Sequence, residues 1–390
     1  MKSVRTLSLV ATGALLSLPL AGVAAASTTV HVSVVVSGLN NPKHLIIGPD
    51  GHLLIVESGV GDPAKKNCVP TIGNTGSPTS TCVAKTGDIL RVTGHTATPI
   101  LRGLESAIDA TSGEVAGPAS AVWVNGHFVV AMQDTDVQAD GSTGLPGADA
   151  FGKLVTAGAY SLRSSWNLGP DLAAFALEHP QTNAGGTPGE SPSDSDPYDL
   201  VSYKGGLAVA DAAANDVLWL SPSGRLSVLG RLPAVAETVP AGVFGPTPVT
   251  IQAQFVPTSL AVGTDGALYV GGLRGVPSLP GTASVYRIVP GHAPSLYAKG
   301  FSAISDLAFD NQGRLLVLEL STGGLLAPPT VPGALIRVNY NHSRTTVLSA
   351  GLSQPTGLVV AKDGAIYIAN HGTSPGSAVP SGEIVRITFS

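Results

Sequence analysis

The chain has 390 residues, of which 43% are hydrophobic and 12% are charged, with 48 glycines and 30 prolines. The hydrophobic share is sufficient for a packed core, and the glycine and proline content stays below that of disordered chains. A formal net charge of −5 excludes a generally basic nucleic-acid-binding protein. All-β domains often reach this length as one unit, so we expect a single domain.

Residues 1–26 have the pattern of a secretory signal peptide. A basic start and an apolar stretch over residues 7–20 precede three alanines that end at Ala26. Cleavage there would release residues 27–390 into the extracellular space or the periplasm. The alternative is a membrane anchor. No later run is long and apolar enough to cross a membrane, so we expect no membrane contact after cleavage.

The chain contains two cysteines, Cys68 and Cys82, in a stretch rich in glycine, proline and threonine. In an exported protein such a pair is normally a disulfide. It would close a loop of about 15 residues, which is worth about 3 kcal/mol in the chain-entropy model. A redox or metal-binding pair is the alternative, but no histidine lies nearby.

One unit recurs along the chain: a strand, a tight turn rich in Asp, Asn and Gly, and a second strand. The repeats start near residues 42, 118, 197, 257, 304 and 355. A third strand follows each repeat, at residues 87–92, 152–157, 216–221, 284–289, 334–339 and 383–388. A fourth strand follows most of them. Four antiparallel strands per repeat are typical of a propeller blade, so the sequence predicts an all-β, six-bladed β-propeller.

The last repeat lacks a fourth strand because the sequence ends at Ser390. Residues 34–42 match residues 347–355, with Gly38-Leu39 opposite Gly351-Leu352. We therefore expect residues 30–39 to complete the last blade and close the ring, which removes an exposed sheet edge.

The second blade departs most from the pattern. Residues 166–179 have helical spacing, and residues 181–196 are polar and rich in glycine and proline. Neither segment indicates a domain boundary, so both are interpreted as insertions within one ring.

Propeller geometry places the start of each first strand and the end of each second strand on one face, together with the loop that leads to the third strand. Long loops on a rigid scaffold often carry function. On this face, here called the loop-rich face, the long loops are residues 58–86, 133–151, 272–283, 320–333 and 371–382.

Two rings of side chains lie at these strand positions. The third residues of the repeats are His44, Ser120, Asp199, Ser259, Asp306 and Gly357. The last residues of the second strands are Glu57, Met132, Asp211, Gly272, Glu319 and Asn370. The candidate ligand-binding residues are His44, Glu57, Asp199, Asp211, Asp306, Glu319 and Asn370.

Carboxylates and an amide without cysteine suit Ca²⁺ or another hard divalent cation rather than Zn²⁺. The candidate metal ligands are Glu57, Asp199, Asp211, Glu319 and Asn370. The alternative interpretation is that these side chains hydrogen-bond neighbouring blades and fill a watery channel, in which case no cofactor is needed.

An arginine recurs in the third strand, as Arg91, Arg287, Arg337 and Arg386. A residue that recurs around a ring is more often structural than catalytic, so we expect blade-to-blade hydrogen bonds. A basic binding ring is the alternative.

The chain resembles the ScyD/ScyE family of exported bacterial propellers over nearly all of its mature length. The segments that carry the resemblance are VPTSLAVGTDGALYVGGL, GTASVYRIVPG and GFSAISDLAFDNQGRLLVLEL, with the Cys68/Cys82 loop that ends in TGDILRV. The phrase around Asp211 and Asn215 is similar to NHL-type repeats. The resemblance implies an exported six-bladed propeller and no defined reaction.

Motifs of the common hydrolases, nucleotide-binding proteins and zinc proteases are absent from the sequence. The first hypothesis is therefore a secreted, monomeric, non-catalytic scaffold that binds a small molecule, a glycan or a protein through the loop-rich face. The second is a metal-dependent lactone or ester hydrolase resembling gluconolactonase-type propellers, with His44 as the proton-transfer group. A purely structural surface protein is the third.

Overall fold

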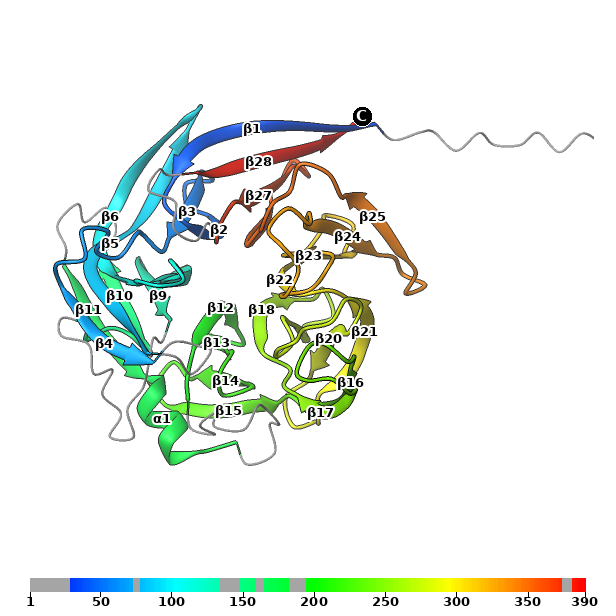
Figure 1. Ribbon diagram of the computed structural model, residues 1–390. Helices are drawn as coiled ribbons and strands as arrows, with labels where there is room; N and C mark the ends of the chain where they lie inside the picture. The colour runs from blue at the N-terminus through cyan, green and yellow to red at the C-terminus, as the bar shows by residue number, and fades with distance from the viewer. Residues whose placement is uncertain (1–28, 73–77, 134–147, 159–164, 182–193, 374–380) are drawn as a thin grey trace, which may run out of the picture.

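The computed structural model describes residues 29–72, 78–133, 148–158, 165–181, 194–373 and 381–390. Its antiparallel sheets are arranged as six blades around a central axis (Figure 1), which confirms the predicted six-bladed β-propeller. The expected signal peptide lies outside the described residues. None of the helices in the described ranges has both the length and the apolar character that a membrane span requires.

Each blade begins with a strand next to the axis and ends with a strand at the rim. The first blade contains β2 (Pro42–Ile47), β3 (Leu53–Glu57), β5 (Pro78–Thr93), β6 (Thr96–Asp109) and β7 (Val115–Ala116), with β4 (Cys68–Ile72) paired to β5. The second contains β8 (Pro118–Val124), β9 (His127–Met132), β10 (Lys153–Gly158) and β11 (Trp166–Asp171). The third contains β12 (Pro197–Tyr203), β13 (Gly206–Asp211), β14 (Asp216–Leu220) and β15 (Leu226–Arg231).

The remaining blades repeat the same order. The fourth contains β18 (Pro257–Val262), β19 (Leu268–Gly272), β20 (Ala283–Ile288) and β21 (Ser295–Phe301). The fifth contains β22 (Ile304–Phe309), β23 (Leu315–Glu319), β24 (Ala334–Val338) and β25 (Arg344–Leu348). The sixth contains β26 (Gly357–Val360), β27 (Ile366–Asn370), β28 (Gly382–Phe389) and β1 (Val30–Leu39).

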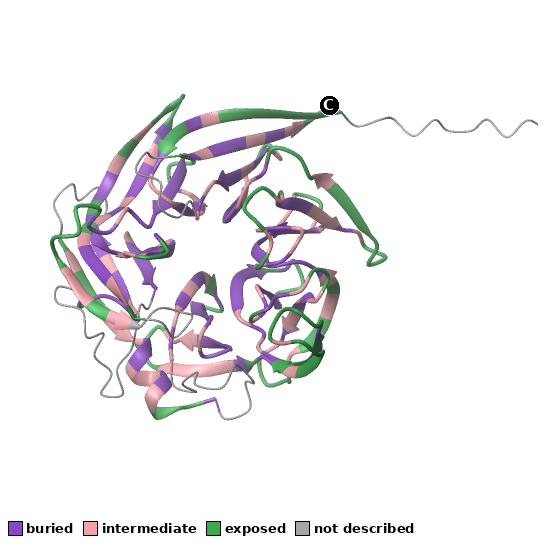
Figure 2. Cartoon of the chain, viewed as in Figure 1, coloured by how far each residue is buried: buried purple, intermediate pink, exposed green. Residues whose placement is uncertain are grey.

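Neighbouring blades pack face to face through the β-branched and leucine side chains of their inner strands. In one cluster, Leu54 and Ile89 of the first blade pack with Val130 of the second. Figure 2 shows that buried residues lie along the inner strands, whereas rim strands such as β1 and β25 are largely exposed. The core is therefore a ring of hydrophobic layers between blades, and each blade depends on both neighbours.

The N-terminal strand closes the ring, as predicted. β1 runs antiparallel to β28, with Leu39 opposite Gly382 (Figure 1). Val36 and Leu39 are buried in a cluster that contains residues of both the sixth and the first blade. The first and last described strands are thus joined within one sheet, and β28 is not left as an open edge.

The helical interpretation of residues 166–179 is wrong for its first half. Residues Trp166–Asp171 form β11, the fourth strand of the blade, because they pair with β10. The helix α1 covers only Leu172–Glu178, and the Asp171 carboxylate caps it by accepting a hydrogen bond from Ala174 N at 2.8 Å. The polar stretch that follows falls largely outside the described residues.

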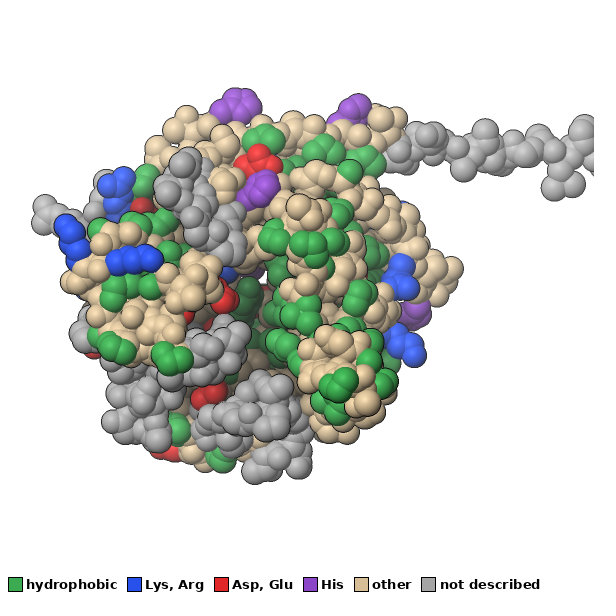
Figure 3. Space-filling view, in the orientation of Figure 1, with side chains coloured by type: hydrophobic (Ala, Val, Ile, Leu, Met, Phe, Trp, Pro, Cys, Tyr) green, Lys and Arg blue, Asp and Glu red, His purple; other side chains and the backbone are tan. Residues whose placement is uncertain are grey.

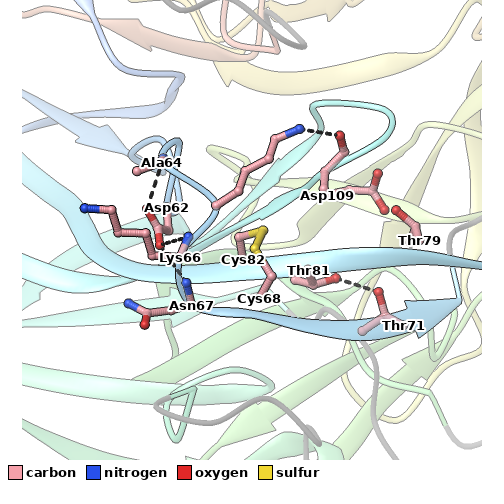
Figure 4. Close-up of a disulfide and its surroundings, with 12 residues drawn as sticks. Asp62, Ala64, Lys66, Asn67, Cys68, Thr71, Thr79, Thr81, Cys82 and Asp109 are labelled. Carbon is pink, nitrogen blue, oxygen red and sulfur yellow. Dashed lines mark hydrogen bonds between the residues drawn. A yellow bond between two sulfur atoms is a disulfide. The ribbon is translucent and has the colours of Figure 1, made fainter.

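The expected loop at residues 58–86 is in part a sheet extension. β4 pairs with the first half of β5, with Cys68 directly opposite Cys82. The two cysteines form the predicted disulfide (Figure 4). Beside it, the Asp62 carboxylate accepts hydrogen bonds from Lys66 N and Asn67 N, each at 2.9 Å. The described part of the insertion thereby extends the sheet of the first blade.

A hairpin that the sequence analysis missed lies between the third and fourth blades. It consists of β16 (Val235–Val239) and β17 (Val249–Ala253). Glu237 on β16 forms a buried ion pair with Arg274, at 3.3 Å, which attaches the hairpin to the segment after β19.

The third-strand arginines bond within their own blades rather than forming the expected blade-to-blade hydrogen bonds. In three blades the partner is the aspartate of the turn between the first two strands. The N···O distances are 2.9 Å for Arg91–Asp50, 2.7 Å for Arg287–Asp265 and 3.3 Å for Arg386–Asp363. The register of the strands explains these ion pairs. Each arginine lies opposite a residue near the start of the second strand, a few positions after the turn that holds its aspartate partner.

Candidate functional site

The acidic and amide side chains at the ends of the second strands hold the backbone that enters the same blade. Glu57 Oε1 accepts a hydrogen bond from Asn40 N at 2.6 Å, and Glu319 Oε1 accepts one from Ser302 N at 2.7 Å. In the sixth blade, Asn370 Oδ1 accepts one from Ser353 N at 2.8 Å. The partner lies 17 residues earlier in each case, so the three residues share one structural role.

Asp211 has the same role in the third blade with more partners. Its carboxylate accepts hydrogen bonds from Asp196 N at 2.8 Å, Ala214 N at 3.1 Å and Ser195 Oγ at 2.6 Å. Asp216 lies directly opposite it on β14. Burial raises the pKa of both carboxyl groups, and the charge of Asp211 raises that of Asp216 further.

Burial also dominates the ionisation of Glu57 and Glu319. It raises the pKa of each carboxyl group to about 7, although the hydrogen bond from the backbone acts in the opposite direction. Both residues therefore titrate near neutral pH, well above the range of an ordinary glutamate.

Asp199 and Asp306, on the first strands of alternate blades, join each blade to the next one. The Asp199 carboxylate accepts hydrogen bonds from Leu200 N and from Ser120 Oγ of the second blade, and its second oxygen accepts one from Leu260 N of the fourth, all at 2.7 Å. Asp306 Oδ2 accepts a hydrogen bond from Leu358 N of the sixth blade at 2.6 Å. These two aspartates therefore form hydrogen bonds that connect neighbouring blades of the propeller.

His44 lies between these two aspartates. Its Nδ1 atom is 3.8 Å from Asp199 Oδ1 and 3.8 Å from Asp306 Oδ2. Burial lowers the pKa of His44, an effect that the charge of Asp199 partly offsets. Burial raises the pKa of Asp199 and Asp306. The structure thus brings together three of the predicted residues in a group that can hold and exchange protons.

The five predicted metal ligands do not fit a single metal centre. Glu57, Asp211, Glu319 and Asn370 each accept hydrogen bonds from the backbone of their own blade. Asp199 is held by its neighbours instead. Over the ranges that the structure describes, no group of three or more His, Cys, Asp or Glu side chains is arranged to hold a metal ion.

The side chains at the second position of the repeats are not among the residues predicted from the sequence. In the fourth and sixth blades this position is threonine, and its hydroxyl donates to a carbonyl of the next blade: Thr258 to Ile304 O at 2.7 Å and Thr356 to Pro42 O at 2.6 Å. Lys43 and Tyr198 occupy the same position in the first and third blades. Comparison of the repeats at this position, rather than at the next one, would have identified them.

Lys43 is buried without a partner. Only 8% of its surface is exposed, and no hydrogen bond or ion pair joins its ammonium group to another residue in the described part of the chain. Burial lowers the pKa of Lys43, and the carboxylates of Glu114 and Asp196 raise it in partial compensation. Placing a lysine in a largely buried position is costly, so Lys43 calls for a functional explanation.

Tyr198 lies in the same electrostatic environment. Burial raises the pKa of its phenol, and the charges of Asp196 and Glu114 raise it further. The same two carboxylates act electrostatically on Lys43 and on Tyr198, which hold the second positions of β2 and β12. Asp196 precedes β12, and Glu114 lies between β6 and β7. These four residues are here called the channel mouth. Figure 3 shows acidic side chains at the central opening of this face, next to hydrophobic ones.

Comparison with known proteins identifies the fold. No protein-family model and no curated protein sequence matches the chain, so the resemblance to the ScyD/ScyE family stays a prediction. Among solved structures, a glucose dehydrogenase aligns with a TM-score of 0.53 at 13% identity, over 92% of this chain and 100% of that one.

Two further solved structures align over similar lengths. A putative oxidoreductase (glucose dehydrogenase) from Thermus thermophilus aligns with a TM-score of 0.51 at 16% identity, over 92% of this chain and 100% of that one. The PQQ-bound aldose sugar dehydrogenase from Streptomyces coelicolor aligns with a TM-score of 0.50 at 12% identity, over 94% and 99%. At such identities the likeness shows a shared fold, and the neighbours are six-bladed β-propeller proteins.

Proposed function

We propose that the protein is an exported, non-catalytic binding scaffold that takes up a small, hydroxyl-rich molecule such as a saccharide at the channel mouth. The observation that carries this proposal is the buried position of the Lys43 residue, whose ammonium group has no hydrogen bond or ion pair among the described residues. Keeping such a group in the fold costs stability, which is typical of residues retained for binding.

The chemistry of the channel mouth supports this ligand class. Lys43 and the Tyr198 hydroxyl are hydrogen-bond donors, and the carboxylates of Glu114 and Asp196 are acceptors with more than one site each. A sugar hydroxyl both donates and accepts, so a saccharide can use donors and acceptors that lie side by side. Concave sites with a few convergent polar groups are the usual form of small-molecule sites.

Binding of monosaccharides and disaccharides to residues 27–390 tests the proposal by isothermal titration calorimetry. We expect at least one sugar to bind, and Lys43→Met to weaken this binding at least tenfold. Lys299→Met removes an exposed lysine from the rim strand β21 and serves as the matched control. Unchanged binding by the Lys43 variant, or no binding by any sugar in the panel, would contradict the proposal.

Lactone or ester hydrolysis is the second candidate function, and the position of His44 is the observation that favours it. A histidine whose pKa is lowered by burial is neutral at neutral pH and can accept a proton. We expect His44→Gln to abolish any turnover of a lactone panel assayed with and without Ca²⁺, Mg²⁺, Mn²⁺ or Zn²⁺. Absence of turnover in the unaltered protein would reject this candidate for those substrates.

A further inference from the structure

The fifth blade breaks the aspartate–arginine pattern of the other arginine-containing blades. Its third-strand arginine is Arg337, but the turn position held by Asp50, Asp265 and Asp363 elsewhere is Gln312. Arg337 therefore lacks the carboxylate that its counterparts have.

The equivalence of these positions rests on backbone geometry. The turn of the fifth blade closes with a hydrogen bond from Asp310 N to Arg314 O at 2.9 Å, as the turn of the fourth blade closes from Gly263 N to Ala267 O at 2.9 Å. Arg337 lies opposite Leu316, as Arg287 lies opposite Tyr269, two residues after the turn in both cases. The difference between the blades is thus in the side chain at position 312 and not in the backbone.

Among the described residues, no other acidic side chain takes the place of the missing aspartate. Asp310 is bound to Arg314 of its own turn, with Nε 2.7 Å from the carboxylate. Arg337 donates a hydrogen bond from Nε to Asn339 Oδ1 at 3.2 Å. In the part of the chain that the structure describes, the two terminal nitrogens of Arg337 have no acceptor.

Arg337 lines a cavity of about 580 Å³ between the fifth and sixth blades. Arg314 and Arg386 line it too, together with Asp310 and Asp363. Three guanidinium groups and two carboxylates leave a formal charge of +1 in the cavity. Its polar lining includes the side chains of Asn311, Gln312 and Thr388, and Phe389 adds an apolar wall.

We infer that this cavity binds a small hydroxylated carboxylate, such as a sugar acid, with the carboxylate on the free edge of Arg337. A guanidinium group binds a carboxylate through two parallel N–H···O hydrogen bonds, so the ligand would replace the missing aspartate side chain. A monoanion balances the formal charge of the cavity, and the neighbouring amide and hydroxyl groups can bond the ligand's hydroxyls. The cavity lies among the turns opposite the loop-rich face, so this inference is independent of the channel mouth.

Calorimetric titration of residues 27–390 with sodium gluconate at low ionic strength tests the inference. We expect gluconate to bind, glucose not to bind, and Arg337→Met to weaken gluconate binding at least tenfold. Gln312→Asp restores the side chain of the other blades and gives Arg337 an internal partner, so it should weaken binding equally without loss of thermal stability. Arg287→Met, in the fourth blade, is the matched control and should leave binding unchanged.

Three results would overturn the inference. Gluconate that fails to bind the unaltered protein would show that Arg337 is not a carboxylate site. Full binding by the stable Gln312→Asp variant would place the ligand elsewhere. Inorganic phosphate that competes with gluconate at equal concentration would show that the cavity selects charge alone and not a hydroxylated carboxylate.

Discussion

Replacing Glu57 and Glu319 together with glutamine is expected to raise the free energy of unfolding at pH 8 by several kcal/mol. Glutamine keeps the oxygen that accepts Asn40 N or Ser302 N, but it has no charge to bury. The sixth blade has an uncharged side chain at this position, because the amide oxygen of Asn370 accepts the equivalent backbone hydrogen bond. Chemical denaturation at a series of pH values measures the effect.

The raised pKa values of Glu57 and Glu319 determine how the free energy of unfolding changes with pH. Each carboxyl group has a pKa of about 7 in the folded chain, against 4.5 for the ordinary group. The folded state therefore binds more protons between these values, and stability falls as the pH rises from about 4.5 to about 7. A shift of this size corresponds to roughly 3 kcal/mol per group. The double variant should lose this part of the pH dependence and differ little from the unaltered protein at pH 4.

Two variants control for this result. Glu178→Gln removes an exposed carboxylate at the end of α1 and should leave the pH dependence unchanged. Asn370→Asp introduces a buried carboxyl group next to Glu383 and should lower stability at pH 8 more than at pH 4. A Glu57/Glu319 double variant that is less stable at pH 8 would show that the ionised carboxylates stabilise the fold, contrary to this interpretation.

Leu39→Ala is expected to lower the free energy of unfolding by about 2–4 kcal/mol. Leu39 is 4% exposed and belongs to the cluster that joins the first and sixth blades. The substitution leaves a cavity at the point where the ring closes, so the loss should affect the cooperative unfolding of the whole propeller. Denaturant unfolding followed by circular dichroism measures it.

Val34→Ala, on the same strand, is the matched control. Val34 is 49% exposed and lies opposite Val385 on β28. Its loss should cost less than about 1 kcal/mol, the usual range for a surface strand position. Equal effects of the two substitutions would show that β1 is attached only by its backbone hydrogen bonds and not by the core.

Much of the fold is predictable because a repeated strand pattern specifies a blade, and a circular permutation specifies how the ring closes. The match of residues 34–42 to residues 347–355 predicts a contact between the two ends of the chain. The helical prediction for residues 166–171 is wrong because their apolar spacing fits a helix, whereas pairing with β10 makes them a strand. The hairpin of β16 and β17 escapes prediction because it belongs to no repeat.

The site is less predictable for a different reason. An acidic residue at the end of a strand looks the same in the sequence whether it binds a ligand or caps the backbone. The structure distinguishes ligand binding from backbone capping, since the carboxylates of Glu57 and Glu319 accept hydrogen bonds from backbone N–H groups. Lys43 and Gln312 differ from the residues at the same positions of other blades. Only the structure shows which partners those other residues have, as for Thr258 and Asp265, so the importance of the difference cannot be predicted from the sequence.

The stability of Lys43→Met at pH 7, measured by denaturant unfolding against Lys299→Met, tests the binding interpretation of the channel mouth most directly. Burial lowers the pKa of Lys43, so its cost to folding is present in full below the lowered pKa and disappears above the ordinary value of 10.5. We predict that Lys43→Met raises the free energy of unfolding by at least about 1 kcal/mol, and that the control changes nothing. A loss of stability in the Lys43 variant would contradict the account, because it would show that this ammonium group holds the fold together.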